Sequence, residues 1–567
     1  MKMLKRILSC LLSAVLLFSM FACTRKAESN TEDDLTTEET TTTPEETTTP
    51  EPEPEPVEIK TKKIYLMEGE SYTLNYESDG NDSNIEWSSS TDCVTVKDGV
   101  VTAVKGGYSK IRANWGNECI VYVLSKKMPI ISVNTGGQSI QDRENYVSCQ
   151  VTVYSDNDDY DLTAAAGIRY RGNSTFNNFA KKPYRIKFNS KTNLLGMNAG
   201  AECKSWVLLA ECYDDSFSRN AAAYSLAGAI LDEYSSDFRY VKVYINGEYK
   251  GVYLLAEQSQ INSNRVDIEE AGEDTSNLAS GYLFEVNASD PYDSTKTFKI
   301  YHDGYDILKM NGSKFTGAYG VGGERAHFMT LKNDGFSHDQ LMFIKYYLRG
   351  VFEIMYQATY KNTAYEFKYD IFGNQEEAAK FLAACSDGND YWNGLIKSET
   401  KTPREAFEAV VDVDSLVKMY IFSEIICNGD APWKSYYLWT DLSEGGSGKL
   451  TFGCPWDHDG AIVNWNTYDY CPTEGYFDAN GNVWHMIAMY NGWFRELVRE
   501  EWKRVYEANN GFETTLNMIS SVSKAYESEF VKEKQMWNRQ YAQSYQAGLT
   551  RDWLAKRIAW MQKEFGK

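Results

Sequence analysis

Three aspartates in the second half of the sequence have the spacing that phosphoryl transfer asks of acidic side chains. Asp430 follows an apolar segment, and Asp457 and Asp459 stand 27 and 29 positions further on, in the run Pro-Trp-Asp-His-Asp-Gly. One carboxylate can orient an attacking hydroxyl and accept its proton, while others hold Mg²⁺ against nucleotide phosphates. Two aspartates two positions apart on an extended chain point to the same side, where a cation offsets their repulsion. The pattern predicts a site for a nucleotide with Mg²⁺; the alternative is three ordinary loop and turn acids.

A group of basic residues lies upstream. Six Lys and Arg fall within nineteen positions: Arg169, Arg171, Lys181, Lys182, Arg185 and Lys187. In a chain with a net charge of −22, a local basic patch indicates phosphate binding, and the alternative is a solvated sheet face. Arg185 and Lys187 are predicted to share one face of a strand. Glu257 follows an apolar run, where it can pair with a Lys that holds phosphates or simply face water at a strand end.

A helix and a hairpin must bring the acids together. Residues 413–427 have an apolar stripe at helical spacing and end at Asn-Gly-Asp, a helix stop that contains Asp430. Residues 436–439 and 449–453 are predicted as two strands joined by a Gly-Gly-Ser-Gly turn. The helix therefore ends at the first acid, and the hairpin leads into the other two.

The wider pattern is a sheet-rich half followed by a helix-rich half. Strand-like segments dominate from about 129 to 335, with one helix at 218–231, and Asn246-Gly247 between two alternating runs predicts a tight hairpin. Helical segments follow to the C-terminus. This order indicates an α+β fold rather than a doubly wound one.

Residues 57–126 carry short strands separated by Gly, Asp, Asn and Ser, which predicts a small all-β sandwich. The phrases Trp-Ser-Ser-Ser at 87–90 and Asp-Gly-Val-Val-Thr-Ala-Val-Lys-Gly-Gly at 98–107 resemble a bacterial Ig-like domain of the Big-2 type. That resemblance implies a spacer or adhesive module without chemistry of its own.

The N-terminus has the features of an export signal. Lys2, Lys5 and Arg6 precede an apolar run that ends at Ala22-Cys23, so residues 1–23 resemble a bacterial lipoprotein signal with Cys23 as the lipidated residue. We expect a protein at the outer face of the cell membrane, attached only through the lipid; plain secretion is the alternative. Residues 24–56 are rich in Thr, Glu and Pro and are predicted as a disordered, extended linker.

Composition narrows the function further. The 567 residues are 43% hydrophobic and 14% aromatic, which excludes a wholly disordered or multi-spanning membrane protein. The negative charge argues against a nucleic-acid partner. Because the chain has only five His and no Cys-x-x-Cys pair, a metal site built from Cys and His is not expected.

Several motifs in the same order resemble the spore coat protein H (CotH) kinase family. They are Arg-Gly-Asn-Ser-Thr at 171–175, Lys-Lys-Pro-Tyr-Arg-Ile-Lys-Phe at 181–188, Trp-Val-Leu-Leu-Ala at 206–210, Asp-Asp at 214–215 with Arg-Asn at 219–220, the segment 244–257, Arg-Val-Asp-Ile at 265–268 and Pro-Trp-Asp-His-Asp at 455–459. The resemblance implies an atypical, two-lobed protein-kinase-like fold over 129–567, including C-terminal helices. It also implies the use of ATP and Mg²⁺ to phosphorylate Ser on protein substrates.

The resemblance assigns roles to individual residues. Asp430 matches the catalytic aspartate, Asp457 matches the metal-binding aspartate, and Asp459 assists it. The candidates for contacts with the ATP phosphates are Arg171, Lys182, Arg185 and Lys187, with Glu257 as the partner of Arg185 or Lys187. The family usually has an Asn metal ligand a few residues after the catalytic Asp, whereas Ser435 stands there in this chain. A hydroxyl is a poorer ligand for Mg²⁺ than an amide oxygen, which places efficiency rather than the fold in question.

Three functions remain open from the sequence. The first is an exported ATP- and Mg²⁺-dependent protein serine kinase. The second is a non-catalytic surface adhesin or structural protein with a degenerate kinase-like fold, which the Ig-like module, the linker and Ser435 favour. The third is a glycoside hydrolase, but Asp457 and Asp459 on one strand are too close for the separation of about 5–9.5 Å that such carboxylates need.

Overall fold

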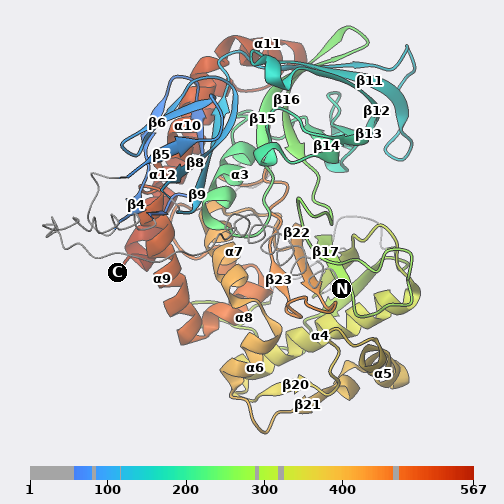
Figure 1. Ribbon diagram of the computed structural model, residues 1–567. Helices are drawn as coiled ribbons and strands as arrows, with labels where there is room; N and C mark the ends of the chain where they lie inside the picture. Colours follow the sequence, from blue (N-terminus) through green and yellow to red (C-terminus); the bar gives the residue numbers. More distant parts are fainter. Residues whose placement is uncertain (1–56, 79–84, 115, 288–292, 317–324, 464–471) are drawn as a thin grey trace, which may run out of the picture. The chain divides into compact units, whose positions relative to one another are not determined.

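The computed structural model describes residues 57–78, 85–114, 116–287, 293–316, 325–463 and 472–567 (Figure 1). All of them belong to one compact unit, which spans Pro54–Lys567. The predicted signal, Cys23 and the linker to residue 56 lie outside the described residues, so the expectations for them remain predictions.

The N-terminal region is all β, as the turn-rich sequence predicts. Two sheets, ordered β2-β9-β8-β5 and β3-β7-β6, contribute to one buried core, and a short pair β1-β4 stands beside them. The strands are β1 (Glu58–Ile59), β2 (Lys63–Met67), β3 (Ser71–Thr73), β4 (Tyr76–Glu77), β5 (Trp87–Ser89), β6 (Val94–Lys97), β7 (Val100–Ala103), β8 (Gly107–Ala113) and β9 (Glu118–Leu124). In β8 alternate residues are buried, the period-2 pattern of a strand with one face on a core.

The next seven strands close into a barrel in the order β10-β11-β12-β13-β14-β16-β15. They are β10 (Ile130–Asn134), β11 (Val147–Tyr154), β12 (Leu162–Tyr170), β13 (Tyr184–Thr192), β14 (Cys203–Leu209), β15 (Phe238–Ile245) and β16 (Glu248–Glu257). In β13 the side chains of Tyr184, Ile186 and Phe188 fill the barrel core. Arg185 and Lys187 therefore share the opposite face of β13, as predicted.

The Asn246-Gly247 hairpin is confirmed between β15 and β16. Both turn residues have positive φ, 51° and 81°, the conformation that a two-residue turn between twisted strands requires. A single helix, α3 (Arg219–Ile230), leads into this hairpin, and every residue of the helix is buried. The Ala-rich sequence of α3 suits this position, because small side chains let a helix be enclosed on all sides.

A second sheet, ordered β18-β19-β17-β22-β23, carries the predicted hairpin. Its strands are β17 (Gly281–Asn287), β18 (Thr297–Tyr301), β19 (Ala326–Leu331), β22 (Lys434–Asp441) and β23 (Thr451–Phe452). In β22 the side chains from Ser435 to Thr440 are all buried, so both faces of the strand are covered. One hydrophobic core joins this sheet to α3 and to α7 (Val413–Ile426), the helix that precedes β22. The helices α3 and α7 lie side by side (Figure 1).

The helix-rich second half is confirmed. It contains α4 (His338–Tyr360), α5 (Gln375–Ser386) and α6 (Pro403–Val410), and α7 matches the helix predicted at 413–427. The remaining helices and short strands are α2 (Ser174–Asn178), β20 (Tyr365–Phe367), β21 (Leu395–Lys397), α8 (Val483–Tyr490), α9 (Gly492–Ala508), α10 (Glu513–Ala525), α11 (Glu527–Trp537) and α12 (Gln543–Phe565). The architecture is thus mixed α+β, with an all-β N-terminal region.

The N-terminal sheets pack on the barrel and the C-terminal helices through a shared core. The ring of Tyr65 from β2 stacks on Phe238 of β15 with centroids 4.4 Å apart. Both residues belong to a buried cluster that also contains Tyr526 and Phe530. Burying a large apolar side chain contributes about 1.5–3 kcal/mol, so this contact is a substantial part of the stability of both regions.

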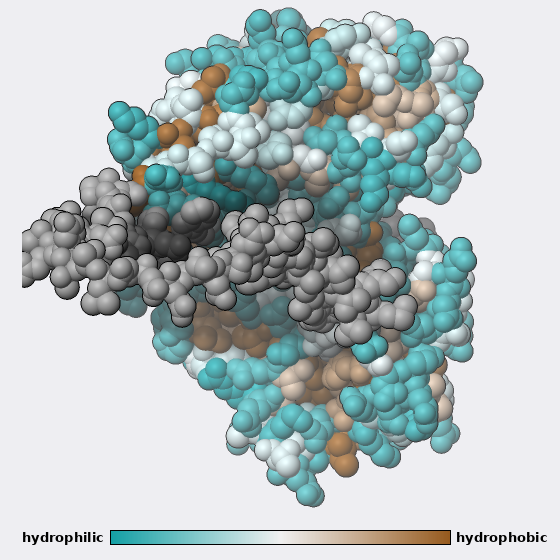
Figure 2. Space-filling model, in the orientation of Figure 1, coloured by the Kyte–Doolittle hydropathy of each residue, from teal (hydrophilic) through white to brown (hydrophobic). Residues whose placement is uncertain are grey.

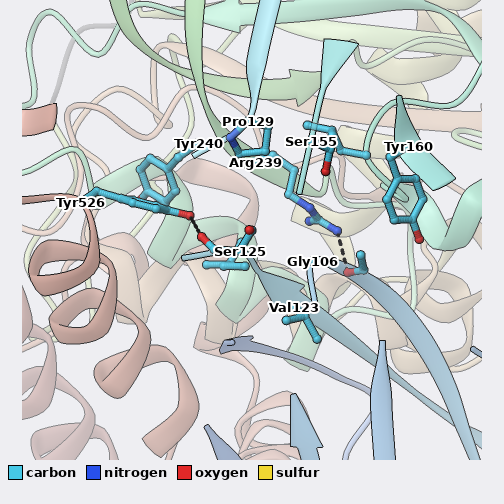
Figure 3. A pocket seen from close by; sticks show the side chains of 12 residues that line it. Gly106, Val123, Ser125, Pro129, Ser155, Tyr160, Arg239, Tyr240 and Tyr526 are labelled. Atoms are coloured by element: carbon cyan, nitrogen blue, oxygen red, sulfur yellow. Dashed lines mark hydrogen bonds between the residues drawn. The ribbon is translucent and has the colours of Figure 1, made fainter. Parts of the chain in front are cut away.

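Polar contacts complete the same interface. The carboxylate of Asp237 accepts hydrogen bonds from Lys63 Nζ at 2.9 Å and from the Tyr65 hydroxyl at 2.7 Å. A small cavity of about 10 Å³, enough for about one water molecule, is lined by Ser125, Arg239 and Tyr526 (Figure 3). The Tyr526 hydroxyl donates to the carbonyl of Ser125, and the Arg239 guanidinium donates to the backbone of β8. The N-terminal region is therefore an integrated part of this unit.

The described surface is mostly hydrophilic on the face that Figure 2 shows, with smaller hydrophobic areas between. Within the described ranges, no helix combines the length with the apolar composition needed to cross a membrane.

Candidate active site

Asp430 lies in a tight turn between α7 and β22. The helix ends at Ile426, and the next residue, Cys427, has a left-handed φ of 47°. The chain then folds back so that the amides of Trp433 and Lys434 both donate to the Asp430 carbonyl, at 2.8 and 2.9 Å. The Trp433 indole donates to the Gly429 carbonyl at 2.7 Å and fastens the other side of the turn. The predicted helix stop is confirmed, and it holds Asp430 in a compact, almost fully buried turn.

Asp457 and Asp459 lie in the segment that follows β23. The expectation of an extended chain here is wrong, because Asp457 has a left-handed φ of 61° and the chain turns at Asp459-Gly460. Alternation along a strand therefore does not set the direction of the two side chains. Both residues are partly buried, between the buried Trp456, His458 and Gly460.

Asn428 ties the two acid-bearing segments together. Its side-chain oxygen accepts from the Asp430 amide at 3.1 Å, and its side-chain nitrogen donates to the Asp457 carbonyl at 3.1 Å. Across the same junction, the Ser435 hydroxyl donates to Oδ2 of Asp457 at 3.2 Å. The structure thus brings Asp430, Asp457 and Ser435 to one place.

The electrostatics show that the acids act on one another. Burial, and then the negative charge of Asp430, raise the pKa of Asp457. The pKa of Asp459 is raised well above its usual value by burial and then by the charges of Asp457, Glu211 and Asp430. Close carboxylates in a poorly solvated place are costly to ionise unless a cation stands among them.

Lys434 is the nearest cation on the same chain segment. Its Nζ lies 3.0 Å from Oδ2 of Asp430. Although burial opposes its charge, the attraction of Asp430, and to a smaller extent of Asp457 and Asp459, keeps the pKa of Lys434 above its usual value. Arg171 supplies a second positive charge, since its guanidinium lies 5.3 Å from the Trp456 ring and its charge lowers the pKa of Asp457.

A row of guanidinium groups extends from Arg171 along the outside of the barrel. Arg185 pairs across strands with Arg169, and the charges of Arg169 and Arg171, together with burial as the largest cause, lower the pKa of Arg185. The Nε atoms of Arg169 and Arg185 are buried without a hydrogen-bond partner. Crowded guanidinium groups with unpaired donors suit a polyanion such as a triphosphate.

The other two residues predicted to contact the phosphates, Lys187 and Lys182, make no contact with the acids in the part of the chain that the structure describes. Lys187 is exposed on the outer face of β13, and Lys182 donates to the Phe176 carbonyl and lies 4.9 Å from the centre of the Phe176 ring. Neither of these contacts involves the acids. Lys181, from the same basic group, is completely buried and pairs with Glu533 at 2.6 Å, so it serves the packing of α11.

The expected pairing of Glu257 with Arg185 or Lys187 is wrong. Glu257 is fully buried and pairs with Arg265 at 3.2 Å, and it also accepts from Asn198 at 3.2 Å and from the Asp237 amide at 3.2 Å. This network belongs to the side of the barrel that contacts β2. The sequence misled here because a carboxylate at the end of a buried strand has several possible cationic partners, and Arg265 is only eight residues away.

The donor set fits Mg²⁺ bound together with a nucleotide. In the part of the chain that is described, no three His, Cys, Asp or Glu side chains form a ready cage for a metal ion. Mg²⁺ usually takes one or two carboxylates and completes its octahedron with water and substrate phosphates. Asp457 and the adjacent Ser435 hydroxyl, with Asp459 nearby, provide such a partial set. A cation among them would favour the ionised form of both aspartates, whose pKa burial raises.

Sequence reasoning missed Lys434 and Asn428. Lys434 lies four residues after Asp430 and at the first position of a strand, and Asn428 lies two residues before Asp430 in the helix stop. Both belong to the segment for which the prediction rested on the aspartate Asp430. Their position next to a candidate catalytic residue was the available signal.

The comparisons with known proteins agree with the motifs. The model of the family described as CotH kinase protein matches residues 168–314 and 331–561, about two thirds of the chain. No curated protein matches the chain. The matched residues include the row of guanidinium groups, the Asp430 turn and the segment with Asp457 and Asp459. On this match the chain belongs to the CotH kinase protein family.

Proposed function

We propose that this protein is an ATP- and Mg²⁺-dependent kinase that transfers the γ-phosphoryl group to Ser on a protein substrate. The observation that carries the proposal is the meeting of Asp430 and Asp457, 27 residues apart in sequence, which Asn428 ties together. Lys434 Nζ lies 3.0 Å from Oδ2 of Asp430. Membership of a kinase-like family supports phosphotransfer in general.

The chemistry assigns Asp430 to the attacking hydroxyl. Its carboxylate accepts the proton of the substrate Ser as the Ser oxygen forms a bond to the γ-phosphorus. The bond between that phosphorus and the β,γ-bridging oxygen breaks, and its electron pair leaves with ADP. Lys434, whose ammonium lies at the Asp430 carboxylate, stabilises the negative charge on the transferring group.

Asp457 and Ser435 would bind the Mg²⁺ ion that accompanies the nucleotide. Mg²⁺ supplies charge neutralisation for the β- and γ-phosphates when it is bound. Asp457, with Asp459 beside it, would hold the ion, and Ser435 takes the place of the family's Asn. The guanidinium row of Arg171 and Arg185 binds the phosphates and orients the nucleotide.

We also propose that the protein works outside the cell membrane. The sequence of residues 1–23 supports export and lipid attachment at Cys23, and the acidic Pro-rich segment to residue 56 supports a spacer. The Ig-like assignment of residues 57–126 draws support from their two sheets around one core.

A non-catalytic role is the second candidate, and one feature favours it. Without a nucleotide the site is already paired, because Lys434 contacts Asp430 and Ser435 donates to Asp457. A degenerate kinase fold in a surface scaffold has no need of a metal, and such internal pairing would then be its resting arrangement.

Transfer of label from γ-³²P-ATP separates the two. The full chain is incubated with Mg²⁺ and Ser-rich peptides, beside Asp430→Asn and the control Asp339→Asn, whose side chain is an exposed acid at the start of α4. The proposal expects labelling by wild type and by the control, and a loss of at least a hundredfold with Asp430→Asn. Equal labelling by Asp430→Asn, or none by wild type, favours the scaffold.

A further inference from the structure

The segment that carries the metal-side acids has an unusual backbone. Asp457, Ile462 and Val463 all have left-handed φ values, 61°, 48° and 54°. This region is unfavourable for β-branched residues such as Ile and Val. The segment therefore needs outside contacts to keep its shape, and the contacts come from the start of α3.

Arg219 holds the far end of the segment. Its guanidinium donates to the carbonyls of Ile462 and Val463, each at 3.1 Å, and pairs with Asp214 on the preceding loop. Arg219 is only 1% exposed, so these contacts are made away from water. The two residues with the least favourable backbone are thus fixed by one buried side chain.

Asn220 holds the acid end. Its side-chain oxygen accepts from the His458 amide at 2.7 Å, between Asp457 and Asp459. Its side-chain nitrogen donates to both carboxyl oxygens of Glu211, at 3.0 and 3.3 Å. Because an amide cannot exchange its donor and acceptor ends without losing both contacts, Glu211 fixes which way Asn220 faces.

Glu211 is itself anchored from the C-terminal part of the chain. Its backbone carbonyl accepts from Arg539, just beyond α11, at 2.9 Å.

One turn further along α3, the ring of Tyr224 lies edge-on to the His458 ring with centroids 5.6 Å apart. His458 is thus held both by its amide and by its side chain.

We propose that Asn220, held by Glu211, is a positioning residue that presets the segment 457–460 for binding a divalent cation. It acts through the His458 amide and does not touch the nucleotide. The inference rests on the proposed function, because it assumes that Asp457 and Asp459 hold the cation that accompanies the nucleotide.

The test measures Mn²⁺ binding rather than activity. The full chain, with a non-hydrolysable ATP analogue, is titrated with Mn²⁺ and followed by electron paramagnetic resonance. Asn220→Ala is expected to weaken Mn²⁺ binding at least tenfold. Glu211→Ala is expected to weaken it about threefold to tenfold, while Glu211→Gln stays within twofold because its amide oxygen still accepts from Asn220.

A control separates positioning from general loss of stability. Asn509→Ala removes another buried asparagine, one that donates to the Val505 carbonyl at 2.7 Å in a different part of the chain. It is expected to lower the melting temperature without changing the affinity for Mn²⁺. Hydrogen exchange of the metal-free protein supplies a second readout, with faster exchange of residues 457–460 expected in Asn220→Ala and not in Asn509→Ala.

The outcomes distinguish this inference from the proposed function. Wild type that binds neither Mn²⁺ nor the nucleotide analogue overturns both. Wild type that binds normally, with Asn220→Ala and Glu211→Ala unchanged in Mn²⁺ affinity, overturns the positioning role alone. An equal loss of affinity in Asn509→Ala also overturns it, since the effect then follows stability. If Asn220→Ala does not fold, the comparison of Glu211→Ala with Glu211→Gln decides.

Discussion

The Ser435 hydroxyl donates a hydrogen bond of 3.2 Å to Oδ2 of Asp457, the aspartate that we propose binds Mg²⁺. The same geometry places the Ser435 oxygen next to any cation that Asp457 binds. Ser435 would therefore be a ligand of a cation bound at Asp457, although its hydroxyl is a weaker ligand than an amide oxygen.

Substitution of Ser435 tests this position. Ser435→Ala removes the oxygen and is expected to raise the Mg²⁺ concentration needed for half-maximal phosphotransfer about tenfold. Ser435→Asn supplies the amide oxygen and is expected to lower that concentration below the wild-type value. A Mg²⁺ titration of the initial rate measures both, and identical titrations for Ala, Asn and wild type would show that position 435 does not bind the ion.

Lys434 is predicted to be essential for the rate. Lys434→Met removes the cation at the Asp430 carboxylate and is expected to lower kcat/KM for ATP by about a hundredfold, the scale for loss of one preorganised electrostatic contact. Lys434→Arg is expected to recover part of that loss. Initial rates against ATP concentration check this, with Lys397→Met on the exposed strand β21 as the control. A kcat/KM within threefold of wild type in Lys434→Met would contradict the role.

Glu233 is predicted to make stability depend on pH. Burial, followed by the charges of Asp412 and Asp232, raises the pKa of Glu233 to about 7 from the usual 4.5. Between these values the folded protein binds more protons than the unfolded chain, so stability falls as the pH rises through this interval. The loss is about 1–3 kcal/mol and is complete above pH 7.

The variant Glu233→Gln isolates this effect. It is expected to have a higher melting temperature than wild type at pH 8 and a similar one at pH 4.5. Thermal unfolding at the two pH values measures the difference. A melting temperature that Glu233→Gln changes equally at both pH values would show that Glu233 does not titrate in this interval.

Removal of the N-terminal sheets is predicted to destabilise the rest of the chain. A fragment of residues 129–567 would expose Phe238 and Tyr240, which the β2 and β9 side chains cover, and would leave Asp237 without Lys63 and Tyr65. The fragment is expected to aggregate, whereas residues 54–567 stay monomeric in size-exclusion chromatography. A monomeric 129–567 fragment with the full-length melting temperature would contradict this.

A single substitution tests the same interface between the N-terminal sheets and the barrel with a smaller structural change. Tyr65→Phe keeps the stacked ring but removes the hydroxyl that donates to Asp237. The free energy of unfolding is expected to fall by about 1–3 kcal/mol, the cost of leaving a buried polar group without its partner. Denaturant unfolding measures the change, and an unchanged midpoint would mean that Lys63 and water satisfy Asp237 on their own.

Local signals in the sequence were sufficient for the elements near the site. The apolar stripe ending at Asn-Gly-Asp located α7 and its stop, and Asn246-Gly247 located the barrel hairpin, because both depend on residues adjacent in the chain. The closure of seven strands into a barrel depends on pairing between distant segments, such as β10 with β15, and no local pattern encodes it.

The convergence of Asp430 and Asp457 was predictable from the sequence, but the surroundings of these acids were not. Asp430 and Asp457 were identified by type and spacing. The partner of Glu257 was not, since several cations competed and only the fold selects Arg265. The left-handed backbone at Asp457 also escaped prediction, because the hydrogen bonds around it come from Asn220 and Asn428 in other segments.

The most direct test of the account is calorimetric titration of the full chain with a non-hydrolysable ATP analogue, with and without Mg²⁺, for wild type and Asp457→Asn. The account predicts that Mg²⁺ strengthens binding to wild type at least tenfold and has little effect on Asp457→Asn. Equal nucleotide affinity in all four titrations, or no binding at all, would contradict a metal-bound nucleotide between Asp457 and the row of guanidinium groups.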